Sequence, residues 1–243
     1  MTMLPESTEK KLGLLIDLDH CVGCHACVVN CKSWNTGGDS NALSDQDPYG
    51  ESASGSWLNR IHSYEVQDDH TGCGMTVHFP KSCLHCEDAP CVPVCPTGAS
   101  YKREADGIVL VNEDQCFGCG LCAWACPYGA REIDEAAGIM KKCTLCVDRI
   151  YNENLPVEDR EPACVRTCPA KARHFGDFAD PNSKVSQLSA RYGGVDLMPE
   201  QGTKPVNKYL MPRKAPTPKA NPSEAQSQEG ILAWVDRWLA KLD

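Results

Sequence analysis

The chain has 243 residues, a formal net charge of −9 and 17 cysteines. The acidic charge argues against nucleic acid as a partner, because the phosphate backbone attracts basic surfaces. There is no run of about 18 apolar residues, and residues 1–11 hold neither an apolar signal core nor a twin arginine, so we expect neither a transmembrane helix nor an export signal.

The apolar run Leu12–Leu18 predicts a β-strand that leads into a group of four cysteines. Two residues separate the first three cysteines from one another, and three residues separate the third from the fourth. Bacterial ferredoxins use this spacing: three thiolates of one turn bind one [4Fe–4S] cluster, and the fourth reaches a second cluster. Residues Cys27–Trp34 are expected to form a short helix. This first quartet consists of Cys21, Cys24, Cys27 and Cys31.

Between the first and second quartets the sequence predicts a loop and a hairpin. Residues 35–56 are rich in Gly, Ser, Asn and Asp, which indicates a long surface loop. Trp57–Val66 and Met75–Phe79 carry aromatic and β-branched residues and are expected to pair as two strands. Cys73 lies in the turn between them, outside every quartet, and we interpret it as a thiol without a ligand role.

Three further quartets vary the same spacing. The second is wider between its second and third cysteines, and the fourth has a long insertion at the same place. The third repeats the spacing of the first, is followed by Pro127, and comes after the predicted strand Gly107–Asn112. Only one cysteine falls outside this spacing, which makes a disulfide scaffold or a zinc-sequestering protein a poor alternative. The three quartets are Cys83, Cys86, Cys91 and Cys95; Cys116, Cys119, Cys122 and Cys126; and Cys143, Cys146, Cys164 and Cys168.

An internal repeat surrounds the quartets. The motif Cys-Pro-x-x-Ala closes the second, third and fourth quartets, and its last two copies continue into Arg131 and Arg173. We interpret the repeated unit as a small βαβ-like ferredoxin element. Two copies make a two-cluster module, so the sequence predicts an α+β fold of two tandem bacterial-type 2[4Fe–4S] ferredoxin-like modules with long loops.

The chain changes character after the fourth quartet. Residues 179–230 carry Gly, Pro, Ser and Asn throughout, which predicts an extended arm with little core of its own. Apolar residues then recur at helical spacing over Ile231–Asp243, which predicts an amphipathic helix. This helix could dock on the chain's own surface, on a partner subunit or on a membrane surface, and we favour a subunit interface.

The residues favour electron transfer over other chemistry. The histidines are scattered, and the sequence holds no GxGxxG loop and no P-loop, so we expect no catalytic residue in this chain. Sixteen cluster ligands support one-electron chemistry, in which the protein surroundings set each reduction potential. Several clusters in so short a chain must lie close together, and such a relay is useful only between two redox partners.

Over residues 12–178, the four quartets with these gaps resemble the four-cluster iron–sulfur subunit of the dimethyl sulfoxide reductase family of molybdenum enzymes. The resemblance implies four [4Fe–4S] clusters between a molybdopterin catalytic subunit and a quinone-reactive membrane subunit. The motif Asp47-Pro48-Tyr49-Gly50 and the proline-rich tail are most similar to subunits of cytoplasm-facing sulfite dehydrogenases. This implies a cytoplasmic subunit, held at the inner face of the membrane by its partner. Dimethyl sulfoxide, polysulfide or tetrathionate reductase is the alternative, and a hydrogenase or formate-lyase electron subunit is a more distant one.

The resemblance also implies how the ligands are shared. In the family, the first quartet exchanges its fourth cysteine with the fourth quartet, and the second exchanges with the third. The implied modules are residues 12–34 with 140–178, and residues 57–139. The implied sets are Cys21, Cys24, Cys27 and Cys168 for cluster 1; Cys31, Cys143, Cys146 and Cys164 for cluster 2; Cys83, Cys86, Cys91 and Cys126 for cluster 3; and Cys95, Cys116, Cys119 and Cys122 for cluster 4.

Overall fold

The computed structural model describes residues 3–36, 56–67 and 74–213. Residues up to Pro212 form one compact unit, and residues from Arg213 onward form a second unit that lies almost wholly outside the described residues. Three features of the sequence also lie outside them: the motif at residues 47–50, Cys73, and the helix predicted over Ile231–Asp243.

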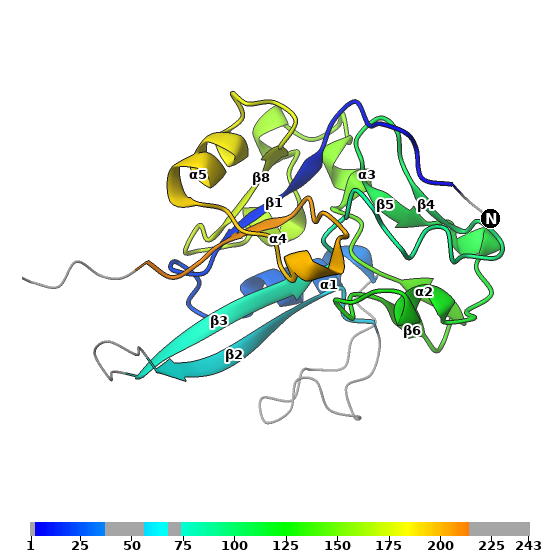
Figure 1. Ribbon diagram of the computed structural model, residues 1–243, viewed down its shortest axis with the longest axis horizontal. Coiled ribbons are helices and arrows are strands. Elements are labelled where there is room, and N and C mark those ends of the chain that lie inside the picture. The colour runs from blue at the N-terminus through cyan, green and yellow to red at the C-terminus, as the bar shows by residue number, and fades with distance from the viewer. Residues whose placement is uncertain (1–2, 37–55, 68–73, 214–243) are drawn as a thin grey trace, which may run out of the picture. The chain divides into compact units, whose positions relative to one another are not determined.

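A three-stranded sheet joins the two ends of the described chain. Its central strand is β1 (Leu12–Asp17), which pairs antiparallel with β8 (Arg173–Asp177) and parallel with β9 (Lys208–Leu210). Figure 1 shows β1 in blue between the yellow-green β8 and the orange β9. The apolar run of β1 is fully buried, as a central strand requires. The sheet therefore brings the segment before the first quartet beside the segment after the fourth.

Three antiparallel hairpins complete the strands. The predicted hairpin is confirmed: β2 (Asn59–Gln67) pairs with β3 (Gly74–Ser82) along its whole length. The strand expected over Gly107–Asn112 is shorter than predicted. The other two hairpins join β4 (Ser100–Lys102) to β5 (Val109–Val111), and β6 (Glu132–Asp134) to β7 (Ile139–Lys141).

Most helices begin inside the cysteine quartets. α1 (Ala26–Asn35) confirms the helix predicted over Cys27–Trp34. The residues that precede α1, α2 and α3 have left-handed backbone conformations, with φ of 58° at His25, 77° at Gly120 and 51° at Cys146. Such a residue reverses the chain sharply, which lets neighbouring thiols of one turn point to one side. The short helices are α2 (Leu121–Trp124), α3 (Val147–Ile150), α4 (Ala163–Arg166) and the 3₁₀ turns Glu113–Gln115, Val157–Asp159 and Pro199–Gln201.

The prediction of an extended arm from residue 179 is wrong for its described part. α5 (Lys184–Tyr192) begins at Ser183, whose side chain caps it, and it buries Val185 completely. Strand β9 then adds to β1 and buries Tyr209 and Leu210. The glycines and prolines of this segment form turns between short packed elements.

Candidate iron–sulfur centres

All sixteen cysteines of the four quartets are free thiols, and many of them belong to the main apolar core. Ten are buried, whereas Cys24 and Cys119 are exposed. A cysteine-lined core of this kind is expected where the protein packs around a bound group rather than around its own side chains alone. The four partly buried ones are Cys21, Cys116, Cys126 and Cys168.

One cavity collects cysteines from the second and third quartets. Its volume, counted to its open mouth, is about 320 Å³, roughly ten times the liquid volume of a water molecule. The Ser100 N–H points to the Cys95 sulfur at 3.4 Å, and the Met140 N–H points to the Cys116 sulfur at 3.3 Å. Backbone donors of this kind stabilise negative charge on sulfur. The lining cysteines, called group 4 here, are Cys95, Cys116, Cys119 and Cys122.

A second cavity, of about 290 Å³, collects cysteines from the first and fourth quartets. Asn35, at the end of α1, directs its amide to the sulfurs of Cys31 at 3.5 Å and Cys146 at 3.7 Å. Arg173 from β8 also lines this cavity. The helices α1 and α4 pack against each other here and carry ligands from opposite ends of the chain. The lining cysteines, called group 2, are Cys31, Cys143, Cys146 and Cys164.

The remaining cysteines interact in two more groups, again drawn from two quartets each. In group 3, burial raises the pKa of Cys86 to about 12, and the charges of Cys83, Cys91 and Cys126 act in the same direction. In group 1, burial raises the pKa of Cys21, and Cys27 and Cys168 act on it in the same way. Cys24 holds an exposed position in the same turn as Cys21 and Cys27.

Burial controls the protonation of these thiols. It raises the pKa of Cys143 to about 12 and that of Cys164 to about 11, because a thiolate loses its hydration inside the core. A free thiol with such a pKa stays protonated at neutral pH, and iron must displace the proton when it binds. These sites therefore need strong positive charge nearby to hold thiolates.

The donors fit [4Fe–4S] clusters. Each of groups 2, 3 and 4 offers four thiols, the number of ligands that a cubane takes. Within the described residues, no three His, Cys, Asp or Glu side chains converge closely enough to hold a single metal ion. Four thiols around a cavity, with N–H donors directed to their sulfurs, match a cluster with several iron atoms.

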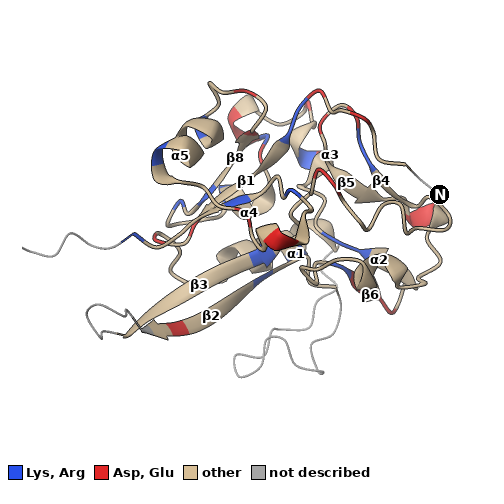
Figure 2. Cartoon of the chain, viewed as in Figure 1, with Lys and Arg blue, Asp and Glu red and all other residues tan. Residues whose placement is uncertain are grey.

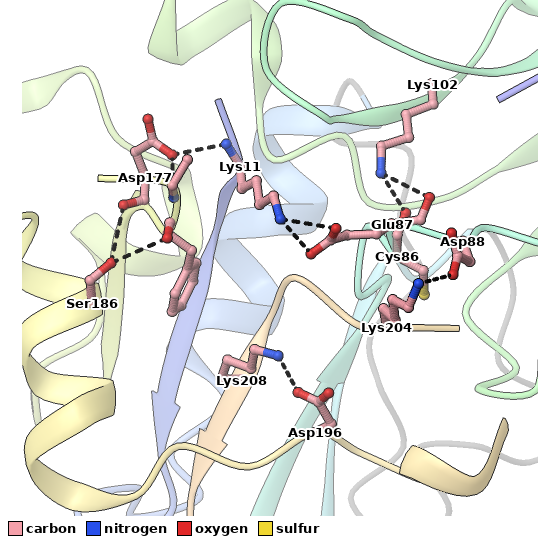
Figure 3. A network of polar contacts seen from close by, with 12 residues as sticks. Lys11, Cys86, Glu87, Asp88, Lys102, Asp177, Ser186, Asp196, Lys204 and Lys208 are labelled. Atoms are coloured by element: carbon pink, nitrogen blue, oxygen red, sulfur yellow. Dashed lines mark hydrogen bonds and ion pairs between the residues drawn. The ribbon is translucent and has the colours of Figure 1, made fainter. Parts of the chain in front are cut away.

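The loop that carries the second quartet is fastened from distant parts of the chain. Figure 3 shows the loop Cys86–Asp88 held on several sides. Lys11 lies 2.9 Å from both carboxylate oxygens of Glu87, and Lys102 donates to the carbonyls of Cys86 and Glu87 at 2.9 Å and 3.1 Å. Lys204 pairs with the last carboxylate of the loop at 2.8 Å. The segment predicted to be an arm thus holds a cluster loop in place.

Two residues of that segment were missed by the sequence analysis. Asn207, fully buried, accepts from the Leu14 N–H at 2.7 Å and donates to the Cys83 carbonyl at 2.9 Å. It therefore links β1 to the second quartet. Thr203 hydrogen-bonds with Tyr128 at 2.5 Å and opposes the rise in the pKa of Cys86. Each is a single polar residue with no sequence pattern to mark it.

Acidic and basic residues are interspersed over many elements rather than gathered on one of them (Figure 2). This distribution offers no basic stripe for a phosphate backbone among the described residues. None of the helices in this part of the chain is long and apolar enough to cross a bilayer.

Comparison with known proteins agrees with the cysteine geometry. A family model described as a 4Fe–4S dicluster domain matches residues 75–178. The chain is 58% identical over 204 residues to the B subunit of sulfite dehydrogenase from Allochromatium vinosum, and the match covers 84% of each protein. It belongs to the iron–sulfur subunit family of dimethyl sulfoxide reductase-type enzymes.

Two further relatives of this iron–sulfur subunit act on other sulfur compounds, according to their names. The B subunit of tetrathionate reductase from Salmonella typhimurium is 36% identical, and the match covers 84% of this chain and 74% of the relative. The corresponding protein of polysulfide reductase from Wolinella succinogenes is 38% identical, with coverage of 84% and 96%. The chain is thus a [4Fe–4S] electron-transfer subunit of an oxidoreductase, with mixed helix and strand content.

Proposed function

We propose that this subunit relays electrons through four [4Fe–4S] clusters, from a molybdopterin subunit that oxidises sulfite to sulfate toward a quinone-reactive membrane subunit. The observation that carries the relay is the gathering of cysteines from two quartets around each cavity. A shared arrangement keeps neighbouring centres close, because one short chain segment supplies ligands to both.

We assign the ligands as the sequence implies. Groups 2, 3 and 4 each hold one cluster, and group 1 holds a fourth together with the exposed Cys24. Contacts of Cys21 with Cys27 and Cys168, and of Cys86 with Cys126, support the exchange of the fourth cysteine between quartets. The pairing of β1 with β8 supports a module built from residues 12–34 and 140–178, with residues 57–139 as the other.

A bound [4Fe–4S] cluster supplies one-electron transfer, and this chain's residues determine where the electron enters and leaves. Cys24 in the first set and Cys119 in the last are exposed, whereas groups 2 and 3 are mostly buried. The exposed turns are therefore the places where partner subunits approach most closely. The buried residues between them exclude water and hold each thiolate in a fixed position.

Sulfite is the preferred substrate of the complex because of the 58% identity to a sulfite dehydrogenase subunit. The alternative is tetrathionate, polysulfide or dimethyl sulfoxide reduction, which the names of relatives at 35–38% identity support. We further propose that the subunit lies on the cytoplasmic side, at the membrane through its partner.

Purification of the native complex tests this function. We expect this chain to co-purify with a molybdopterin protein and a multi-helix membrane protein. Sulfite added without oxygen should bleach the visible absorption of the clusters, and a quinone analogue should restore it. Bleaching by a reduced quinone, followed by recovery with tetrathionate, polysulfide or dimethyl sulfoxide, would favour the reductase alternative. No response to any of these compounds would contradict both.

A further inference from the structure

Three cations are buried in the region of the cysteine groups. Arg131 is 6% exposed, Lys142 is 3% exposed and Arg173 is 3% exposed. Among the described residues, none of the three forms an ion pair with a carboxylate. A buried charge without a partner is strongly destabilising, so the folded protein must supply negative charge in another form. The cysteine sulfurs are the groups that lie near enough to do so.

Arg131 lies between groups 3 and 4. Its Nη2 donates to the sulfur of Cys91 at 3.0 Å and to the hydroxyl of Ser100 at 2.8 Å. Burial alone would lower the pKa of Arg131, but Cys91, Cys122 and Cys83 act on it and the pKa is raised. Two of these cysteines belong to group 3 and one to group 4. The guanidinium therefore interacts with both groups at once.

Arg173 holds the corresponding place between groups 1 and 2. Its Nη2 donates to the Asn59 side chain at 2.7 Å. Burial alone would lower the pKa of Arg173, but Cys27 and Cys164, followed by Cys31 among the cysteines, raise it. Cys27 belongs to group 1, and the other two belong to group 2. The two arginines are repeat-related, since each lies five positions after the last cysteine of its quartet.

Each arginine keeps one donor unused. The Nη1 atoms of Arg131 and Arg173 are buried, and no acceptor among the described residues takes a hydrogen bond from either. Buried guanidinium donors are normally satisfied, because an unpaired one costs free energy. The matching place after the second quartet holds Ser100, and Arg131 reaches across to bond with it. Two unpaired donors at equivalent places of a repeat indicate a common acceptor, such as cluster sulfur.

Lys142 lies between groups 2 and 3. Its Nζ donates to the backbone carbonyls of Val109 and Cys143. Its charge opposes the rise in the pKa of Cys143, in group 2, and of Cys91, in group 3. Cys143 also interacts with Cys83 of group 3, so these two groups are neighbours. One buried cation thus lies in each gap of the proposed relay.

We propose that Arg173, Lys142 and Arg131 set the reduction potentials of the relay, each from the gap between two neighbouring clusters. The inference rests on the ligand assignment above. A cubane of two ferric and two ferrous ions, four sulfides and four thiolates is a net anion, and one added electron makes it more negative. A nearby cation stabilises the reduced form more than the oxidised form, and low local polarity strengthens this effect. The electron passes from one cluster to the next, and no proton or bond moves.

Potentiometric titration of the purified complex, followed by electron paramagnetic resonance, tests the proposal. Arg131→Gln should lower the potentials of the clusters on groups 3 and 4. Arg173→Gln should lower those on groups 1 and 2, and Lys142→Gln should lower one from each pair. The reduced-to-oxidised ratio at a fixed potential should fall at least tenfold, which is about 59 mV for a one-electron couple. Iron content, measured first on each variant, tests the ligand assignment separately.

Matched variants separate charge from structure. Arg131→Lys and Arg173→Lys keep the charge and should restore most of each shift. Arg166→Gln removes a charge from the same helix as Cys164, but that side chain is 56% exposed and paired with Asp159, so its potentials should not change.

Full iron with unchanged potentials in the glutamine variants would overturn the proposal and leave the ligand assignment intact. If a glutamine variant loses iron, the lysine variant decides the question. Iron restored by lysine supports the role of charge, whereas loss in both variants contradicts it.

Discussion

At the scale of single residues, the site depends on polar side chains that join segments far apart in the sequence. Asn207 lies 193 positions from Leu14 and 124 positions from Cys83, and it bonds to the backbone of both. Both bonds are buried, so no water can replace them. A cluster loop and the central sheet are therefore coupled through one amide.

Asn207→Ala should destabilise the protein by about 1–3 kcal/mol for each of the two backbone groups that it leaves unpaired. Iron should also be lost faster from group 3, because the Cys83 carbonyl loses its donor. Thermal unfolding and iron release to a chelator would measure the two effects. Asn182→Ala, at an exposed position, is the control. Equal stability of both variants would contradict the coupling.

At the scale of elements, the cysteine turns and helix α1 were predictable, because cluster spacing and helical preference are local properties. α5 and β9 were not, since their short apolar patterns are interrupted by glycine and proline and depend on contacts with β1. Arg131 and Arg173 stood out as ends of the repeat, but their burial among cysteines needed the structure. Sequence spacing predicts which residues bind a cluster and gives no sign of which residues support it.

Truncation distinguishes the packed part of the tail from the rest. A chain that ends at residue 213 keeps β9 and Asn207, so we expect full iron content and an unchanged melting temperature. A chain that ends at residue 202 loses both, together with the contacts of Thr203, and should melt lower and retain less iron. Iron analysis and calorimetry of the two truncated chains measure this. Full iron and stability in the shorter chain would show that residues 203–213 do not support the cluster loops.

At the scale of the whole molecule, the described residues form one unit in which both ends of the chain meet at β1. Cysteines from distant quartets gather in that unit, and exposed ligand turns occur at Cys24 and Cys119. This arrangement suits a subunit that receives electrons at one place and delivers them at another. Its partners are left to bind at the exposed turns and through the C-terminal segment.

The C-terminal segment gives a prediction about assembly. Ile231–Asp243 lies outside the described residues, and we still expect it to form a helix at a subunit interface. Trp234→Ala combined with Trp238→Ala should weaken association by about 2–4 kcal/mol, since tryptophans are frequent anchors of interfaces. Iron content should stay unchanged, because no ligand lies there. Pull-down of the partner subunits measures the effect, and full assembly of the double variant would favour docking on the chain's own surface.

The central claim is that each cluster takes ligands from two quartets, and one resonance measurement tests it directly. Spectra of Cys126→Ser and Cys116→Ser should be recorded beside Cys73→Ser, a control expected to keep about 16 iron atoms from four cubanes. Cys126→Ser should alter the signal of the cluster on Cys83, Cys86 and Cys91, and Cys116→Ser should alter a different one. Loss of the same signal in both variants would mean that the third quartet binds its own cluster, which would contradict the account.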